Sequence, residues 1–514
     1  NLLSLTALPV CGIITAVNRI LSLLLALSTV GVSAAERPNI LFAIADDWSF
    51  GHAGAYGCDW VRTPAFDRVA GEGILFRRAY TPNAKCAPSR AIILTGRNSW
   101  QLEQAGNHMT FFPAKFGSWM ELLEANGYST GYTGKGWGPG YANDANGKPR
   151  KITGRAWQKQ KAKPPARAIS NNDYAGNFAE FLAGANSAKG RPWAFWYGAT
   201  EPHRGYEAGV GRRMGKKLSD IDRVPTYWPD NDVIRNDMLD YSIEVEHYDN
   251  HLGRILDMLE KAGQLGNTLV VATSDHGMPF PRCKSNNYDS GARVPLAIRW
   301  PSKVKAGTVV NDFVSLVDVA PTFYQAADLN VPSNVSGRSL LSLLVGKDKS
   351  DRSYVLHGKE RHVPGQEGKD MGGYPTRAIR THDFLYLHNF RPDRWPAGTP
   401  NYQKAAIKGA WLSDCDNGPT KTYMVENRDK DAHHRGLYEL AFGKRPATEL
   451  YDLKKDPDQL VNIAADSAYA ETVKKLKAHL FAELEKTNDP RVTGKGPDFD
   501  KFPYLGGAPK SPGR

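Results

Sequence analysis

Short apolar runs alternate along the chain with longer segments in which apolar residues recur every three or four positions. The runs have the length and β-branched content of buried strands and lie at 39–45, 128–132, 193–199, 268–274 and 296–300. The helical spacing occurs at 64–71, 118–126, 237–262 and 316–327. This alternation predicts an α/β fold in which helices cover both faces of a mostly parallel sheet.

The rest of the chain indicates a second, smaller part. Residues 138–171 are polar and rich in Lys, Pro and Gly, which predicts a long surface loop. A glycine-rich stretch precedes a strand-like run at 377–389, and a helix is expected near 469–487. At 514 residues the chain exceeds the size at which one core keeps growing. The expected division is a large domain, 36–375, and a C-terminal subdomain, 376–514.

Residues 1–35 differ in composition from the rest. Asn18-Arg19 precedes the apolar run 20–32, and Ser33-Ala34-Ala35 offers small residues for cleavage. Because the run is too short to span a bilayer, we expect a signal peptide and a secreted or periplasmic protein, in a bacterium, with no membrane span. In an oxidising compartment, one disulfide could form among Cys58, Cys283 and Cys415. The sequence does not determine which two of these cysteines would pair.

The formal net charge of +12 indicates an anionic partner or a basic surface without a specific partner. Nucleic acid is not expected, because no zinc-finger, RNA-recognition or basic-zipper pattern occurs. Anionic glycans would be attracted by the same charge.

Two acidic pairs follow predicted strands. Asp46-Asp47 comes directly after 39–45, and Asp275-His276 comes directly after 268–274. In sheets of this class, ligands gather at the carboxyl ends of the strands, so both pairs are expected at one edge. Adjacent carboxylates repel each other unless a cation lies between them. A hard divalent cation is therefore predicted, Ca²⁺ first and Mg²⁺ second, with the neutral imidazole of His276 as a further ligand.

The most specific segment runs from Cys86 to Gly96 and has the form C-x-P-S-R-x-x-x-L-T-G. Pro88 suits the first turn of a helix, which would place Cys86 at a helix N-terminus, where anions bind. Arg90 would lie one turn further on. With Lys135 and Lys284 it brings the charge of three aspartates and one divalent ion to about +2, which suits an anionic substrate.

His203 follows the predicted strand 193–199, where a histidine can protonate a leaving group. Each of these residues also has an ordinary structural interpretation: a buried small cysteine, solvated lysines and a loop histidine.

Together these residues resemble the type I, formylglycine-dependent sulfatases of the alkaline-phosphatase-like superfamily, with the greatest likeness to the sulfamidases (N-sulfoglucosamine sulfohydrolases). In that family the cysteine of the motif is oxidised to Cα-formylglycine. One hydroxyl of the hydrated aldehyde attacks sulfur and the second expels sulfate. The resemblance implies a large mixed sheet between helices and a smaller C-terminal α+β domain containing an antiparallel sheet.

The resemblance also implies roles for individual residues. It places Ca²⁺ on Asp46, Asp47, Cys86 as formylglycine, Asp275 and His276. It gives Arg90, Lys135 and Lys284 to the formylglycine and the sulfate, and His203 to the leaving group. It implies two partners, a sulfated glycan or sugar and a maturation enzyme that generates formylglycine.

This chain departs from the family pattern at Lys135-Gly136-Trp137, where the family has K-x-H. His108 is the predicted substitute, because it follows the Cys86 helix and can fold back toward its start. At His276 and Lys284 the sulfamidases have Asn and Arg. The walls of the substrate pocket are expected from 138–171, 359–362 and 388–391.

Two other functions remain open at this point. A phosphodiesterase or phosphonate hydrolase of the same superfamily would share the metal, although the sequence shows no second His/Asp cluster with suitable spacing. A secreted glycan-binding relative would have lost catalysis at Trp137.

Overall fold

The main sheet has eight strands in the computed structural model, which describes residues 37–187, 190–348 and 351–511. In spatial order they are β10 (Thr308–Ser315), β2 (Ile74–Tyr80), β9 (Arg293–Arg299), β8 (Thr268–Ser274), β1 (Asn39–Ala45), β7 (Trp193–Gly198), β4 (Ser129–Gly134) and β6 (Arg155–Ala156). Only β9 runs antiparallel to its neighbours in this sheet. The sheet is therefore mixed but mostly parallel, which confirms the prediction.

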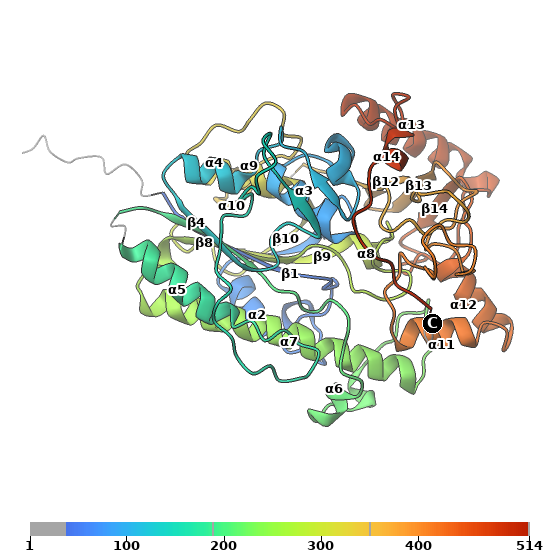
Figure 1. Ribbon diagram of the computed structural model, residues 1–514, viewed down its shortest axis with the longest axis horizontal. Helices are drawn as coiled ribbons and strands as arrows, with labels where there is room; N and C mark the ends of the chain where they lie inside the picture. Colours follow the sequence, from blue (N-terminus) through green and yellow to red (C-terminus); the bar gives the residue numbers. More distant parts are fainter. Residues whose placement is uncertain (1–36, 188–189, 349–350, 512–514) are drawn as a thin grey trace, which may run out of the picture. The chain divides into compact units, whose positions relative to one another are not determined.

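Helices cover both faces of this sheet (Figure 1). One face carries α2 (Pro64–Gly71), α5 (Tyr174–Ser187) and α7 (Asp232–Lys261); the other carries α3 (Cys86–Thr95), α4 (Trp119–Ala125) and α9 (Val319–Ala326). Strand β1 shows why its sequence is apolar throughout. Leu41 and Ala43 pack into the core on one face, whereas Ile40 and Phe42 pack into the core on the other.

A second, antiparallel sheet follows in the C-terminal part, as expected. Its strands are β11 (Tyr354–Lys359), β12 (Thr376–Thr381), β13 (Phe384–Asn389) and β14 (Thr448–Asp452). Helix α13 (Ala470–Lys486) buries Leu476, Leu480 and Leu484 in the same core as Ile379 and Tyr386 of the sheet. Because β11 already begins at Tyr354, this sheet starts before residue 375; the domain boundary there remains a prediction.

The remaining elements are short or peripheral. Besides short 3₁₀ helices, they are β3 (Thr110–Phe112), which pairs with β5 (Gly140–Ala142), and the helices α6 (Val210–Arg213), α8 (Asp289–Ala292), α10 (Leu341–Leu344), α11 (Pro419–Glu426), α12 (Ala432–Phe442) and α14 (Asp498–Lys501). The segment predicted as a loop therefore contains β5 and β6. Helix α7 begins five residues before the expected start at 237, because the Asn231 side chain accepts from the N–H groups of Val233 and Ile234 and caps it.

Three sequence predictions concern the signal peptide, the expected lack of a membrane span and the pairing of the cysteines. The signal peptide lies outside the described residues. Within the ranges that the structure describes, no helix has both the length and the apolar character needed to cross a bilayer. Cys58, Cys283 and Cys415 are free thiols, so the disulfide that the sequence allowed does not form among them.

Candidate active site

The two acidic pairs meet because their strands are neighbours. β1 and β8 pair in parallel with Ala45 opposite Ser274, so Asp46 and Asp275 leave the sheet at the same point. The Asp47 N–H donates to Asp275 Oδ1 at 3.1 Å. All the side chains of both pairs are buried. The structure thus brings both pairs to one sheet edge, where the strand pattern placed them.

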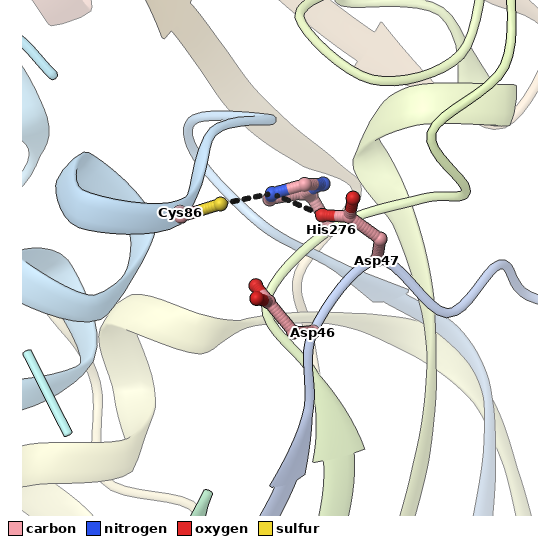
Figure 2. Close-up of side chains that lie close together, drawn as sticks. All are labelled: Asp46, Asp47, Cys86 and His276. Carbon is pink, nitrogen blue, oxygen red and sulfur yellow. Dashed lines mark hydrogen bonds and ion pairs between the residues drawn. The ribbon is translucent and has the colours of Figure 1, made fainter. Parts of the chain in front are cut away.

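A group of four side chains could hold a cation. One ligand atom from each of Asp46, Asp47, Cys86 and His276 lies within 4.8 Å of the others. His276 Nε2 is 3.4 Å from Cys86 Sγ and 3.1 Å from Asp47 Oδ1, and Figure 2 shows both side chains directed at the imidazole. Cys86 Sγ marks the position that an oxygen of formylglycine would take.

Asp47 provides the test of whether this group suits a hard divalent ion. Its backbone has φ +77°, a left-handed conformation that is unusual for a residue other than glycine and is found at functional sites. Its Oδ1 is buried and accepts no hydrogen bond from the described residues, although His276 Nε2 lies 3.1 Å from it. A buried carboxylate oxygen left without a hydrogen-bond donor is the kind of ligand that Ca²⁺ takes, so the residues fit the predicted cation.

Asp275 differs from the other predicted ligands. Its carboxylate accepts from Arg90 Nε at 2.9 Å and from the Asp47 N–H, and it is not one of the four clustered groups. Its Oδ1 nevertheless lies 3.6 Å from His276 Nε2. Burial raises the pKa of Asp275, and the nearby Asp46 carboxylate adds to that rise. Its role as a ligand therefore stays a prediction.

Arg90 connects the start of α3 with Asp275 and with the loop that carries Lys135. In α3 it lies one helical turn after Cys86, so both side chains are on the same face. Its Nη1 donates to the carbonyl oxygens of Lys135 and Gly136, at 2.8 and 3.1 Å. The side chain is wholly buried, and these contacts fix the Lys135 loop against the start of the helix.

The two lysines are held by carboxylates. Lys135 Nζ donates to Asp46 Oδ2 at 2.6 Å, and Lys284 Nζ donates to Asp47 Oδ2 and Asp416 Oδ2, each at 2.8 Å. Burial by itself would raise the pKa of Asp46, but Lys135 and Arg90 hold that pKa well below its usual range. Burial opposes the charge on Lys284, yet Asp416 and Asp47 raise its pKa well above the usual value. The site is therefore built from charged partners.

A cavity of about 420 Å³ opens onto Cys86. Its polar lining includes His108, Lys135, His203, Lys284, His362 and Asp416. The loop that carries His203 is fixed by its neighbour Arg204, whose guanidinium donates to both carboxylate oxygens of Asp237 in α7, at 2.8 and 2.7 Å. The nucleophile position, the cations and the predicted proton donor thus face one cavity.

Sequence reasoning did not identify Asp416, which comes from the C-terminal part and lies within 4.8 Å of Asp47 and His203. Its only signal was an acidic pair, Asp414 and Asp416, in a segment with no strand before it. Three further lining residues, Tyr504, Gly507 and Pro509, were also missed. The predicted wall at 388–391 is wrong, because His388 packs against Phe481 at 5.1 Å between ring centroids and lines no part of this cavity.

Trp137 and His108 both lie close to the start of α3. The Trp137 indole donates to the carbonyl oxygen of Ala87 at 3.0 Å, so it supports the helix and cannot accept a proton. His108 lines the cavity and packs edge-on against His362, with 4.3 Å between ring centroids. Its buried Nδ1 has no hydrogen-bond partner in the described ranges. Burial, followed by the nearby Lys135 and Lys284, lowers the pKa of His108 well below its usual value, so its imidazole is neutral.

Comparison with known proteins now gives the family. Residues 38–329 match the Sulfatase family, and residues 282–391 match the family "N-sulphoglucosamine sulphohydrolase, C-terminal". An ulvan-active sulfatase from Formosa agariphila is 28% identical over 90% of this chain and 84% of its own length. The human N-sulphoglucosamine sulphohydrolase is 28% identical over 91% of this chain and 93% of its own.

A solved structure shares the fold. It is a protein in complex with its substrate D-glucosamine-2-N,6-O-disulfate; the TM-score is 0.60 at 21% identity, over 88% of this chain and 98% of that one. Since the Sulfatase match spans more than half of the sequence, this protein belongs to the sulfatase family.

Proposed function

We propose that this protein hydrolyses sulfate esters or sulfamates on sugar residues of sulfated glycans. The observation that carries this proposal is the position of Cys86, at the start of a buried helix, in one cavity with two lysines and a cation-binding group. The relatives support the substrate class, because their names refer to ulvan and to N-sulphoglucosamine.

Each side chain then has a chemical role. When Cys86 is converted to formylglycine, its hydrated aldehyde supplies one hydroxyl for attack on sulfur and a second for release of sulfate. A Ca²⁺ ion held by Asp46, Asp47, residue 86 and His276 would supply Lewis-acid polarisation, with Asp275 beside it. Lys135 and Lys284 offset the charge of the sulfate, and Arg90 holds the loop that carries Lys135. His203 donates a proton to the leaving oxygen or nitrogen.

The phosphodiesterase alternative can be weighed against a specific contact. Contrary to the expectation from sequence, a second group of possible metal ligands exists, formed by Asp47, His203 and Asp416. The ammonium group of Lys284 donates to both carboxylates of that group. A cation from the chain itself therefore already lies where a second metal would bind, and this favours the sulfatase.

Turnover of an aryl sulfate and of a bis-aryl phosphate tests the proposal directly. We expect the aryl sulfate to be hydrolysed at least about a hundredfold faster, in kcat/KM, because the ammonium group of Lys284 lies where a second metal would bind. Faster cleavage of the phosphate would support the diesterase, and glycan binding without any turnover would support the decayed relative. Release of sulfate from defined O- and N-sulfated monosaccharides and disaccharides then identifies the substrate.

The proposal extends to maturation and location. A maturation enzyme would convert Cys86, and residues 1–35 would direct a bacterial protein to the periplasm or the medium. Expression with the leader, followed by N-terminal sequencing of the protein recovered outside the cytoplasm, tests this. A chain that still begins before residue 35 would contradict it.

His108 is the group proposed to take the proton when sulfate is released, in place of the histidine absent at Trp137. We expect His108→Ala to lower kcat on an aryl sulfate by at least about tenfold, because general-base help contributes about 10²–10⁴-fold. Trp137→His in that background should restore part of the loss. The comparison of kcat with KM separates this role from substrate binding.

Tyr141→Ala is a matched control, because Tyr141 is 58% exposed and lies outside the cavity. It belongs to β5, which pairs with β3, the strand that begins two residues after His108. If His108→Ala turns over at the parent rate, another residue or water releases the sulfate.

A further inference from the structure

A second hollow, of about 1070 Å³, lies outside the catalytic cavity and is rich in basic side chains. It runs along α6 and the start of α7, and its cationic lining residues are Arg212, Arg213, Lys216 and Lys217. Asp232 is the acidic one among its described lining residues. We call this hollow the α6 groove.

Two of its cations are left without a counter-charge. Arg213 pairs with Glu207, and Lys216 Nζ donates to Glu246 and to the Trp60 carbonyl oxygen. Arg212 and Lys217 are exposed and form no ion pair within the described part of the chain. The lining also has the polar side chains of Ser219 and Asn236. The groove therefore offers positive charge and hydrogen-bond donors to an anionic ligand.

The groove and the catalytic cavity are joined by two short segments. Asp416 lines the cavity and Pro419 lines the groove, and three residues span at most about 11 Å. His203 and Ala208 make the same connection on the other segment. A ligand that extends from the cavity along these segments would reach the groove.

Side chains of helix α7 accept hydrogen bonds from both segments. Asp237 binds Arg204 and accepts from Thr420 Oγ1 at 2.6 Å. One turn further on, Asp240 accepts from the N–H groups of Gly209 and Gly211, at 2.8 and 2.9 Å. Figure 1 shows α6 and α11 beside the same end of α7. The groove is therefore held in a fixed position relative to the site.

We infer that the α6 groove binds the continuing chain of a sulfated polysaccharide, beyond the sugar whose sulfate is removed; this inference rests on the proposed function. Sulfate groups repeated along such a chain match the uncompensated Arg212 and Lys217. Nucleic acid fits less well, because no aromatic side chain for base stacking is among the lining residues of the described structure.

Binding of heparin, used as the sulfated probe, tests the inference by titration at low and high salt. The groove variant is Arg212→Glu/Lys217→Glu. Its control is Lys347→Glu/Lys475→Glu, which changes the net charge equally at two exposed lysines outside the groove and the cavity. We expect the groove variant to bind heparin at least about tenfold more weakly at low salt and the control to change by less than about twofold. At about 1 M salt, where the Debye length is about 3 Å, the difference should vanish.

Aryl sulfate turnover should be the same in parent, groove variant and control, because a small substrate does not reach the groove. Equal weakening of heparin binding in both variants would overturn the inference, and so would loss of aryl sulfate turnover in the groove variant alone. Heparin binding is measured without catalysis. A parent protein that binds heparin through the groove but hydrolyses no sulfate would therefore refute only the proposed function.

Discussion

Cys86→Ala should fold like the parent and lose at least about 10⁴-fold in kcat on an aryl sulfate, because the attacking group disappears while the rest of the site stays in place. Burial raises the pKa of the Cys86 thiol, and the Asp46 carboxylate raises it further, so the unmodified side chain is not a thiolate at neutral pH. An unmodified cysteine would thus be a weak nucleophile here. We expect the parent protein to be active only in the fraction that carries formylglycine.

Mass analysis of the peptide that contains residue 86 measures that fraction, and it should scale with turnover across preparations made with and without a maturation enzyme. Cys58→Ala is the matched control, since Cys58 is a free thiol outside the cavity. Thermal unfolding of each variant shows whether the fold is retained. A fully active preparation with only thiol at residue 86 would falsify the proposed chemistry.

Removal of divalent cations should have the second large effect, a loss of at least about 10²-fold in turnover. Without a cation, Asp46 and Asp47 remain buried close together and beside an anionic substrate, which is unfavourable. The melting temperature should also fall, by about 2 °C or less for each kcal/mol lost, because the shift per kcal/mol decreases as chains become longer. Both changes should be reversed by Ca²⁺ and less completely by Mg²⁺.

Asp47→Asn isolates the contribution of the site residues. This variant removes one charge from the group, so its melting temperature should respond less to Ca²⁺ than that of the parent. Turnover that is unchanged in protein shown by elemental analysis to be free of metal would rule out the predicted centre. A melting temperature that responds to Ca²⁺ equally in both proteins would place the ion elsewhere.

Much of the fold could be read from the sequence because the central strands are buried on both faces. β1 and β8 have the predicted bounds, since each contains an uninterrupted apolar run, at 40–45 and 269–272. β2 and β10 were missed for a local reason. Arg77 and Arg78 interrupt the first, and Asn311-Asp312 lies in an irregular part of the second. Polar residues are tolerated there because β10 is an edge strand and β2 is its neighbour.

In the candidate site, too, some residues could be placed from the sequence and others could not. Asp46 and Asp275 could be placed together because each follows a strand of a single sheet, and a strand end is a feature of local sequence. Asp416 could not be placed, because its loop is shaped by a buried lysine. Lys421 Nζ donates to the carbonyl oxygens of Trp411, Leu412 and Cys415. These contacts depend on the folded path of the chain, and no periodicity of apolar residues reports them.

The burial of Cys86 determines whether this side chain can be modified before or after the chain folds. The side chain is 1% exposed, and every residue of its helix is buried, so a separate enzyme cannot reach it in the folded molecule. The contact between Ala45 and Ser274, which helps to close this region, joins positions 229 residues apart. If Cys86 is oxidised as proposed, this must happen on the nascent or newly exported chain, before those distant strands meet. Fast folding would then lower the yield of competent enzyme, and a host that delays folding would raise it.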